Sequence, residues 1–146
     1  MSRILLALSL LISASLPAAA APQDEEKPEI VQRMENMNDI LRQIRRQSRD
    51  AANKASVLEL IKEFRLHALA AQKEKPLKTA DLPEEEREAF VAEFRQTIDK
   101  MLSTLDEFQA AVEAGDSEQA GQLLRRLFEW KKEGHSQFRV QDEDPS

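Results

Sequence analysis

The chain of 146 residues contains no cysteine, no tyrosine and only three glycines. Without cysteine it forms no disulfide bond and no thiolate metal site, so packing or a bound ligand must stabilise it. Ala, Leu, Glu, Gln, Lys and Arg, which favour helices, dominate the composition. No alternating run of β-branched residues is long enough to suggest a strand. The composition therefore predicts an all-α protein.

Long apolar runs are also absent, except for one at the N-terminus. A basic start at 1–3 precedes an apolar segment at 4–16 and the small residues Pro17 to Ala20. This order is typical of a cleaved export signal, and we expect the signal peptide to span 1–20. The alternative is an uncleaved anchor, but the run is shorter than a membrane span. We therefore expect a periplasmic protein without stable membrane insertion.

The sequence has fewer basic than acidic residues. Lys and Arg number 21 against 27 Asp and Glu, which gives a net charge of −6, and losing Arg3 with the signal makes it −7. This balance argues against nucleic acid or an anionic membrane as a partner. It is compatible with docking to a basic protein.

The rest of the chain divides into helical segments. We expect an acidic mobile segment at 21–27, one helical domain at 28–140 and an acidic tail at 141–146. Pro28 and Pro83 suit helix starts, Gly115 suits a left-handed helix end, and Asp116 suits a cap with Gln119 three residues later. A turn is expected at 50–53, a second helix at about 56–73, and a loop at 75–82.

Apolar residues recur at spacings of three and four in each segment, which is the pattern of bundle helices. The four stripes are Ile30, Met34, Met37, Leu41 and Ile44; Val57, Ile61, Phe64, Ala68 and Ala71; Val91, Phe94, Ile98, Met101, Leu105, Phe108 and Val112; and Ala120, Leu123, Leu124, Leu127, Phe128 and Phe138. Short connections between such helices force antiparallel neighbours. The sequence thus predicts an antiparallel up-down-up-down four-helix bundle.

Two stripe positions carry metal-binding atoms. Met34 lies near the start of the first helix and His135 near the end of the last, in phase with Leu124 and Phe128. In this topology both positions belong to the same pole of the bundle. A thioether and an imidazole facing each other there can hold a haem iron. Taken singly, Met34 is as readily a core residue and His135 a helix-end residue.

Other residues near this pole fit such a pocket. Phe94 can form part of an apolar wall, and Gly134 leaves space beside the imidazole. Lys131 and Arg139 lie one turn before and one turn after His135, where they either pair with carboxylates at a cofactor edge or remain solvated. His67 has no second ligand at metal-binding spacing, so we interpret it as a non-ligand.

The chain resembles the soluble cytochrome b562 family. Residues 34–41 (MENMNDIL) are similar to the family's first-helix pattern Met-Glu-x-Leu-Asn-Asp-x-Leu. Residues 135–139 (HSQFR) are similar to its terminal His-x-x-Tyr-Arg. Gly115 stands twenty residues before His135, as the family's turn glycine does.

The resemblance implies a haem b bound non-covalently, with Met34 and His135 as axial ligands. It places Phe94 in the pocket, with Ile98 replacing a second phenylalanine there. Lys131 replaces an arginine at the haem edge, and Gly134 replaces a tyrosine. The implied function is one-electron transfer to a periplasmic redox protein, not enzymatic catalysis.

Two alternatives remain open. One is a haem-free periplasmic bundle of the same ancestry that acts as an interaction or stress protein. The other is a five-coordinate haem protein in which Met34 does not bind the iron and a gas or peroxide enters.

Overall fold

The computed structural model describes residues 26–139, which form four α-helices and two 3-10 helices. No strand occurs within this range. The predicted signal peptide, most of the expected acidic segment and the predicted tail lie outside the described residues. In chain order the elements are α1 (Glu29–Gln47), η1 (Ala51–Asn53), α2 (Lys54–Ala71), η2 (Leu77–Asp81), α3 (Glu84–Ala114) and α4 (Ser117–Phe138).

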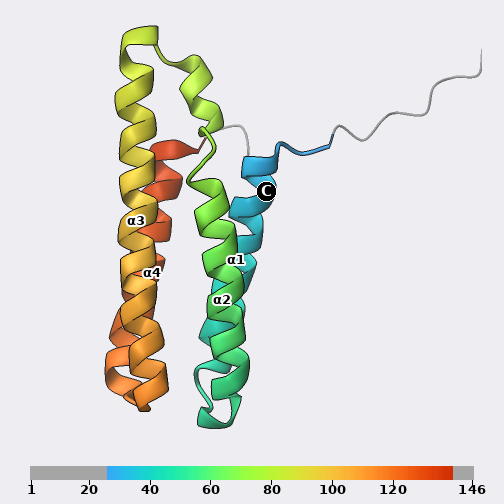
Figure 1. Cartoon of the computed structure of the whole chain (residues 1–146), viewed down its shortest axis with the longest axis vertical. Coiled ribbons are helices and arrows are strands. Elements are labelled where there is room, and N and C mark those ends of the chain that lie inside the picture. Colours follow the sequence, from blue (N-terminus) through green and yellow to red (C-terminus); the bar gives the residue numbers. More distant parts are fainter. Residues whose placement is uncertain (1–25, 140–146) are drawn as a thin grey trace, which may run out of the picture.

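The four helices run side by side with alternating direction, which confirms the predicted antiparallel bundle (Figure 1). α1 packs against α2, and α3 packs against α4; α2 and α3 join the two pairs. The start of α1, the α2–α3 connection and the end of α4 share one pole. Lys78 of η2 donates a hydrogen bond to the Gln137 carbonyl of α4 at 3.1 Å, which fixes the connection at this pole.

The predicted helix ends around Gly115 and Asp116 are confirmed. Gly115 ends α3 with a left-handed φ of 72°, which a residue without a Cβ adopts at little cost. The Asp116 side chain accepts a hydrogen bond from the Gln119 backbone N–H at 3.0 Å and so caps α4. Pro28 and Pro83 immediately precede α1 and α3.

The predicted bounds of the second helix were two residues too late at each end. The Asp50 carboxylate accepts a hydrogen bond from the Ala52 N–H at 2.9 Å and starts the 3-10 turn that leads directly into α2. At the other end the N–H groups of Lys73 and Glu74 bond three residues back, so the last turn tightens after Ala71. The expected loop at 75–82 contains η2.

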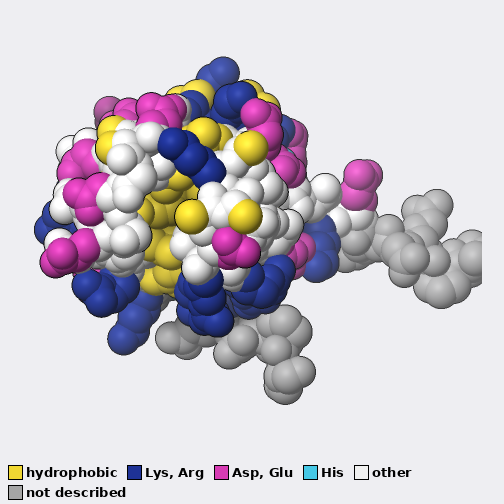
Figure 2. All heavy atoms as spheres, turned by 90° about the horizontal axis from the view of Figure 1, so that it is seen from below, with side chains coloured by type: hydrophobic (Ala, Val, Ile, Leu, Met, Phe, Trp, Pro, Cys, Tyr) yellow, Lys and Arg dark blue, Asp and Glu magenta, His cyan; other side chains and the backbone are white. Residues whose placement is uncertain are grey.

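The predicted apolar stripes form the core. Most of their members are buried, including all five from α2. The half-buried exceptions are Met34, Val112, Ala120 and Phe128. Met34 and Phe128 lie on α1 and α4, whose mutual contacts are far fewer than those within each helix pair. Apolar side chains are visible in the groove between the two pairs in Figure 2.

None of the described helices is long and apolar enough to cross a membrane.

Candidate functional site

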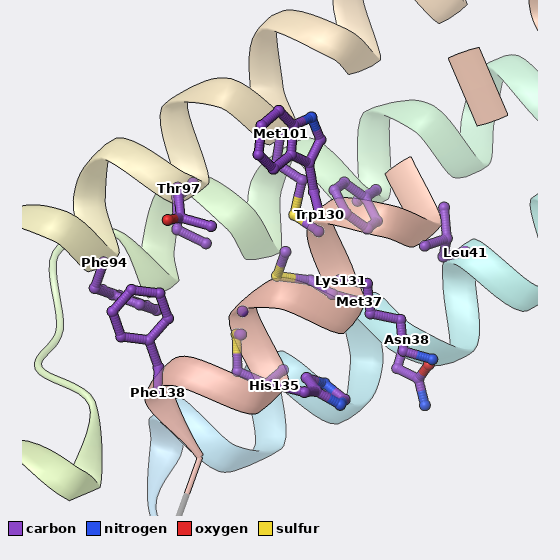
Figure 3. Close-up of a pocket in the computed structure, with 14 residues that line it drawn as sticks. Met37, Asn38, Leu41, Phe94, Thr97, Met101, Trp130, Lys131, His135 and Phe138 are labelled. Atoms are coloured by element: carbon purple, nitrogen blue, oxygen red, sulfur yellow. The ribbon is translucent and has the colours of Figure 1, made fainter. Parts of the chain in front are cut away.

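A pocket opens between the helices toward the pole shared by the start of α1 and the end of α4. Its volume is about 440 Å³ with the open mouth included. All four helices contribute to its wall (Figure 3). The residues that line it are Met34, Met37, Asn38, Leu41, Phe64, Phe94, Thr97, Ile98, Met101, Trp130, Lys131, Gly134, His135 and Phe138.

The structure brings four of the five predicted site residues to this pocket. Met34, Phe94, Lys131 and His135 all line it. Arg139 is not among the lining residues. It caps the end of α4, where its backbone N–H donates to the His135 carbonyl at 3.3 Å, and its positive charge acts on the His135 ring.

His135 is half-buried, and its surroundings favour the neutral imidazole. Burial lowers the pKa of His135 below its ordinary value of 6.5, and the positive charges of Lys131 and Arg139 lower it further. A neutral ring has a free nitrogen lone pair at neutral pH, which is the form that binds a metal. This environment therefore favours the ring form that can bind a metal.

Met34 supplies the second candidate donor atom. Its side chain is half-buried and packs against the core, unlike Met37, one turn further on, which is 3% exposed. A thioether carries no proton and stays neutral at every pH. Together with imidazole it makes a neutral, soft donor pair, which suits the iron of a haem better than a hard cation such as Mg²⁺.

Aromatic rings form one end of the pocket. The rings of Phe94 and Phe138 meet edge to face with centroids 5.3 Å apart, and Phe90 meets Phe138 in the same way at 5.2 Å. Such pairs hold the rings in fixed orientation. In Figure 3, Phe94 and Phe138 lie at one end of the pocket, and the His135 ring points toward the side where Asn38 lies.

Asn38 carries an unsatisfied polar atom into this apolar site. Its Oδ1 is buried and has no hydrogen-bond partner among the described residues. A buried amide oxygen without a partner destabilises the protein, so it favours a bound group that donates a hydrogen bond. The sequence analysis missed Asn38, although its spacing of four residues from Met34 places both on one side of α1.

Thr97 and Trp130 were also missed. The Thr97 hydroxyl bonds to the Glu93 carbonyl at 3.0 Å, which leaves its methyl group toward Gly134. The Trp130 indole N–H donates to the Thr104 hydroxyl at 3.2 Å, so its polar edge is satisfied on α3. The helical spacing of Thr97 from Phe94, and of Trp130 from Gly134, was the signal that could have identified both residues. Each residue adds apolar surface to the wall.

Lys131 stands at the mouth of the pocket. Burial lowers its pKa, and the nearby charges of Arg42 and Arg45 lower it further, while Asp39 opposes this. Lys131 was predicted either as a cation at the cofactor edge or as a solvated residue. It is a half-buried cation that borders both the pocket and the solvent.

No cluster of three or more His, Cys, Asp or Glu side chains suited to a metal ion occurs among residues 26–139. His67 lies on α2, and the pocket wall does not include it.

The sequence model of the cytochrome b562 family, described as "Cytochrome b562", matches residues 29–139. This range contains all four helices and every residue that lines the pocket. The chain therefore belongs to the cytochrome b562 family. That family consists of electron-transfer haemoproteins, so membership implies a haem cofactor and a carrier function. Neither the comparison with curated proteins nor that with solved structures gave a significant match.

Proposed function

We propose that this protein is a periplasmic electron carrier that holds a haem b non-covalently, with Met34 and His135 as the axial ligands. The observation that carries the proposal is the convergence of these two side chains, from opposite ends of the sequence, on one apolar pocket. Non-covalent binding follows from the lack of cysteine, since thioether attachment of haem requires a C-x-x-C-H motif.

The chemistry of the pocket fits a haem. Phe94, Phe138 and Trp130 offer apolar surface to a flat macrocycle, and Gly134 places no side chain over it. We propose that Lys131 and Arg139, whose charges both act on His135, lie near the haem carboxylates.

The residues favour a carrier role over a catalytic one. When bound, haem supplies a reversible one-electron exchange at its iron. If Met34 and His135 both held the iron, no position would remain for oxygen or peroxide, and this donor pair would raise the reduction potential. The lowered pKa of His135 favours the uncharged ring, whose nitrogen can bind the metal.

The periplasmic location is proposed from the N-terminal sequence, whose basic, apolar and small-residue segments follow the order of an export signal. The absence of cysteine is compatible with an oxidising compartment.

The test of the ligands is a visible spectrum of the full-length protein, expressed with its own N-terminal segment and recorded in both redox states. We expect six-coordinate, low-spin bands. Met34→Leu should give high-spin bands because only the thioether is lost, at a small cost in packing. His135→Gln should lose the haem during purification.

Met37→Leu is the matched control, because Met37 lines the same pocket but is buried in the core. It should keep the low-spin spectrum. Absence of a Soret band even after haem addition would contradict the proposal and leave the haem-free bundle. High-spin bands in the unaltered protein would favour the five-coordinate alternative. Recovery of the protein from the cytoplasm alone would overturn the proposed location.

A further inference from the structure

One long face of the bundle, beside the groove between α1 and α4, carries a concentration of cations. Figure 2 shows dark blue side chains gathered at the lower edge, where α1 and α4 lie in that view. We call this surface the α1/α4 basic face. It comprises Arg42, Arg45, Arg125, Lys131 and Lys132.

Phe128 connects the two helices at the centre of this face. The Arg45 guanidinium of α1 lies 4.7 Å from the centroid of the Phe128 ring, and the Lys131 ammonium of α4 lies 5.8 Å from it. Arg125 and Lys132 are three residues before and four residues after Phe128, so helical geometry puts them on the same side of α4. Cations of both helices thus surround one half-buried ring.

The cations of this face act on one another. The pKa of Lys131 is lowered by burial first, and then by the charges of Arg42 and Arg45. The carboxylate that opposes this effect is Asp39, which pairs with Arg42 at 3.5 Å. Cations that lie close together repel one another. Binding of an external anion would offset this repulsion and is therefore favourable here.

Helix dipoles account for only part of this arrangement. Arg45 is in the last turn of α1, where a cation is favourable in any case. Arg125, Lys131 and Lys132 lie before the last turn of α4, where the dipole gives them little. The protein as a whole carries a net charge of −6, so the concentration of cations on this face is not a consequence of composition.

We propose that the α1/α4 basic face is the docking surface for a partner protein with an acidic patch. Lys131 belongs to both this face and the pocket, so a partner bound here lies next to His135. Complementary charge would steer the encounter and fix its orientation. The inference that the partner is a redox protein rests on the proposed function. The inference that the face binds carboxylates does not rest on it.

A partner protein fits this surface better than DNA or a membrane. The net charge of −6 repels any extended polyanion whose field reaches beyond the face. A protein can present a compact acidic patch, and its apolar side chains can cover Phe128. The net charge alone is compatible with a basic partner, whereas the positive face favours an acidic one.

The test is a titration of the 15N-labelled full-length protein with a short poly-L-glutamate peptide, followed by NMR at low salt. Saturable shifts should be concentrated on the α1/α4 basic face and disappear at high ionic strength. The variant Arg42→Gln/Arg125→Gln/Lys132→Gln should weaken binding about tenfold. The control Lys62→Gln/Lys73→Gln/Lys75→Gln, which removes three exposed cations elsewhere, should bind nearly as the unaltered protein does.

Equal weakening in both triple variants, or shifts spread over the whole surface, would overturn the proposal. Tighter binding of a DNA duplex or of phosphatidylglycerol vesicles would show that the binding partner is not an acidic protein. Both the haem-free and the haem-loaded protein are titrated. Peptide binding to a chain that takes up no haem would contradict the proposed function and leave the docking surface intact.

Discussion

At the scale of single residues, the role of a side chain depends on the charges near it and on its exposure to solvent. His135 and His67 are both histidines on helices, yet only His135 lines the pocket. Met34 and Met37 are three residues apart on one stripe, yet only Met37 is fully in the core. Chemical type alone does not separate these pairs.

The environment of His135 predicts a pH dependence of stability. Because folding lowers its pKa, the unfolded chain takes up a proton at higher pH than the folded chain does. This contribution is complete above about pH 6.5 and is lost as the pH falls toward the folded pKa. Urea denaturation of the haem-free protein from about pH 8 to about pH 5 should show this loss.

The variant His135→Gln isolates the effect, because the carboxylates titrate alike in both proteins. Its stability should fall less than that of the unaltered protein across the same pH window. Parallel stability curves for the two proteins would contradict the burial of an uncharged His135.

At the scale of helices, short signals in the sequence determine where each one begins and ends. Asp116 and Gly115 act within one turn of their own position, so the sequence predicts α4's start and α3's end correctly. α2 was misplaced because its start depends on Asp50, which begins a 3-10 turn whose continuation into the helix has no clear sequence signal.

Gly115 and Gly121 provide a matched test of helix-end geometry. An added Cβ would meet nothing within 4 Å at either position, but only Gly115 has a positive φ. Gly115→Ala should therefore lower the free energy of unfolding by about 1–2 kcal/mol. Gly121→Ala, inside α4, should raise it by about 0.5–1 kcal/mol.

Thermal and urea denaturation of both variants measure these changes. Stabilisation by both substitutions would show that the α3–α4 turn does not need its left-handed residue.

At the scale of the whole molecule, the bundle consists of two closely packed helix pairs with a looser seam between α1 and α4. The half-buried Met34 and Phe128 lie along this seam. A ligand that contacts both α1 and α4 at this seam would add to the few contacts that the two helices make with each other. Ligand binding and stability are therefore coupled.

We expect haem to stabilise the fold by mass action, by about 2.7 kcal/mol when free haem is at a hundred times its dissociation constant. Urea denaturation followed by far-UV circular dichroism, with and without haem, measures this difference. Met37→Leu should retain the increment, and His135→Gln should lose most of it. An equal increment in His135→Gln would indicate nonspecific haem adsorption.

Much of the fold and part of the site were predictable from local pattern. The stripes of α2 and α3 identified core residues because burial follows helical periodicity. Met34 and His135 were predicted to meet because short connections permit one arrangement of four helices. Asn38 and Trp130 were not predicted, because their roles depend on which neighbouring helix each one faces and on whether a hydrogen-bond partner lies there.

The sequence by itself determined the helices, their alternating direction and the pole at which Met34 and His135 lie, since helical period and connection length are local properties. Only the tertiary structure decided the charge and solvent exposure at each position. Burial and two neighbouring cations lower the pKa of His135. The packing of α1 beside α4 gathers Arg42, Arg45 and Lys131 into a positive face on a negatively charged chain, because electrostatic interactions depend on distance in space.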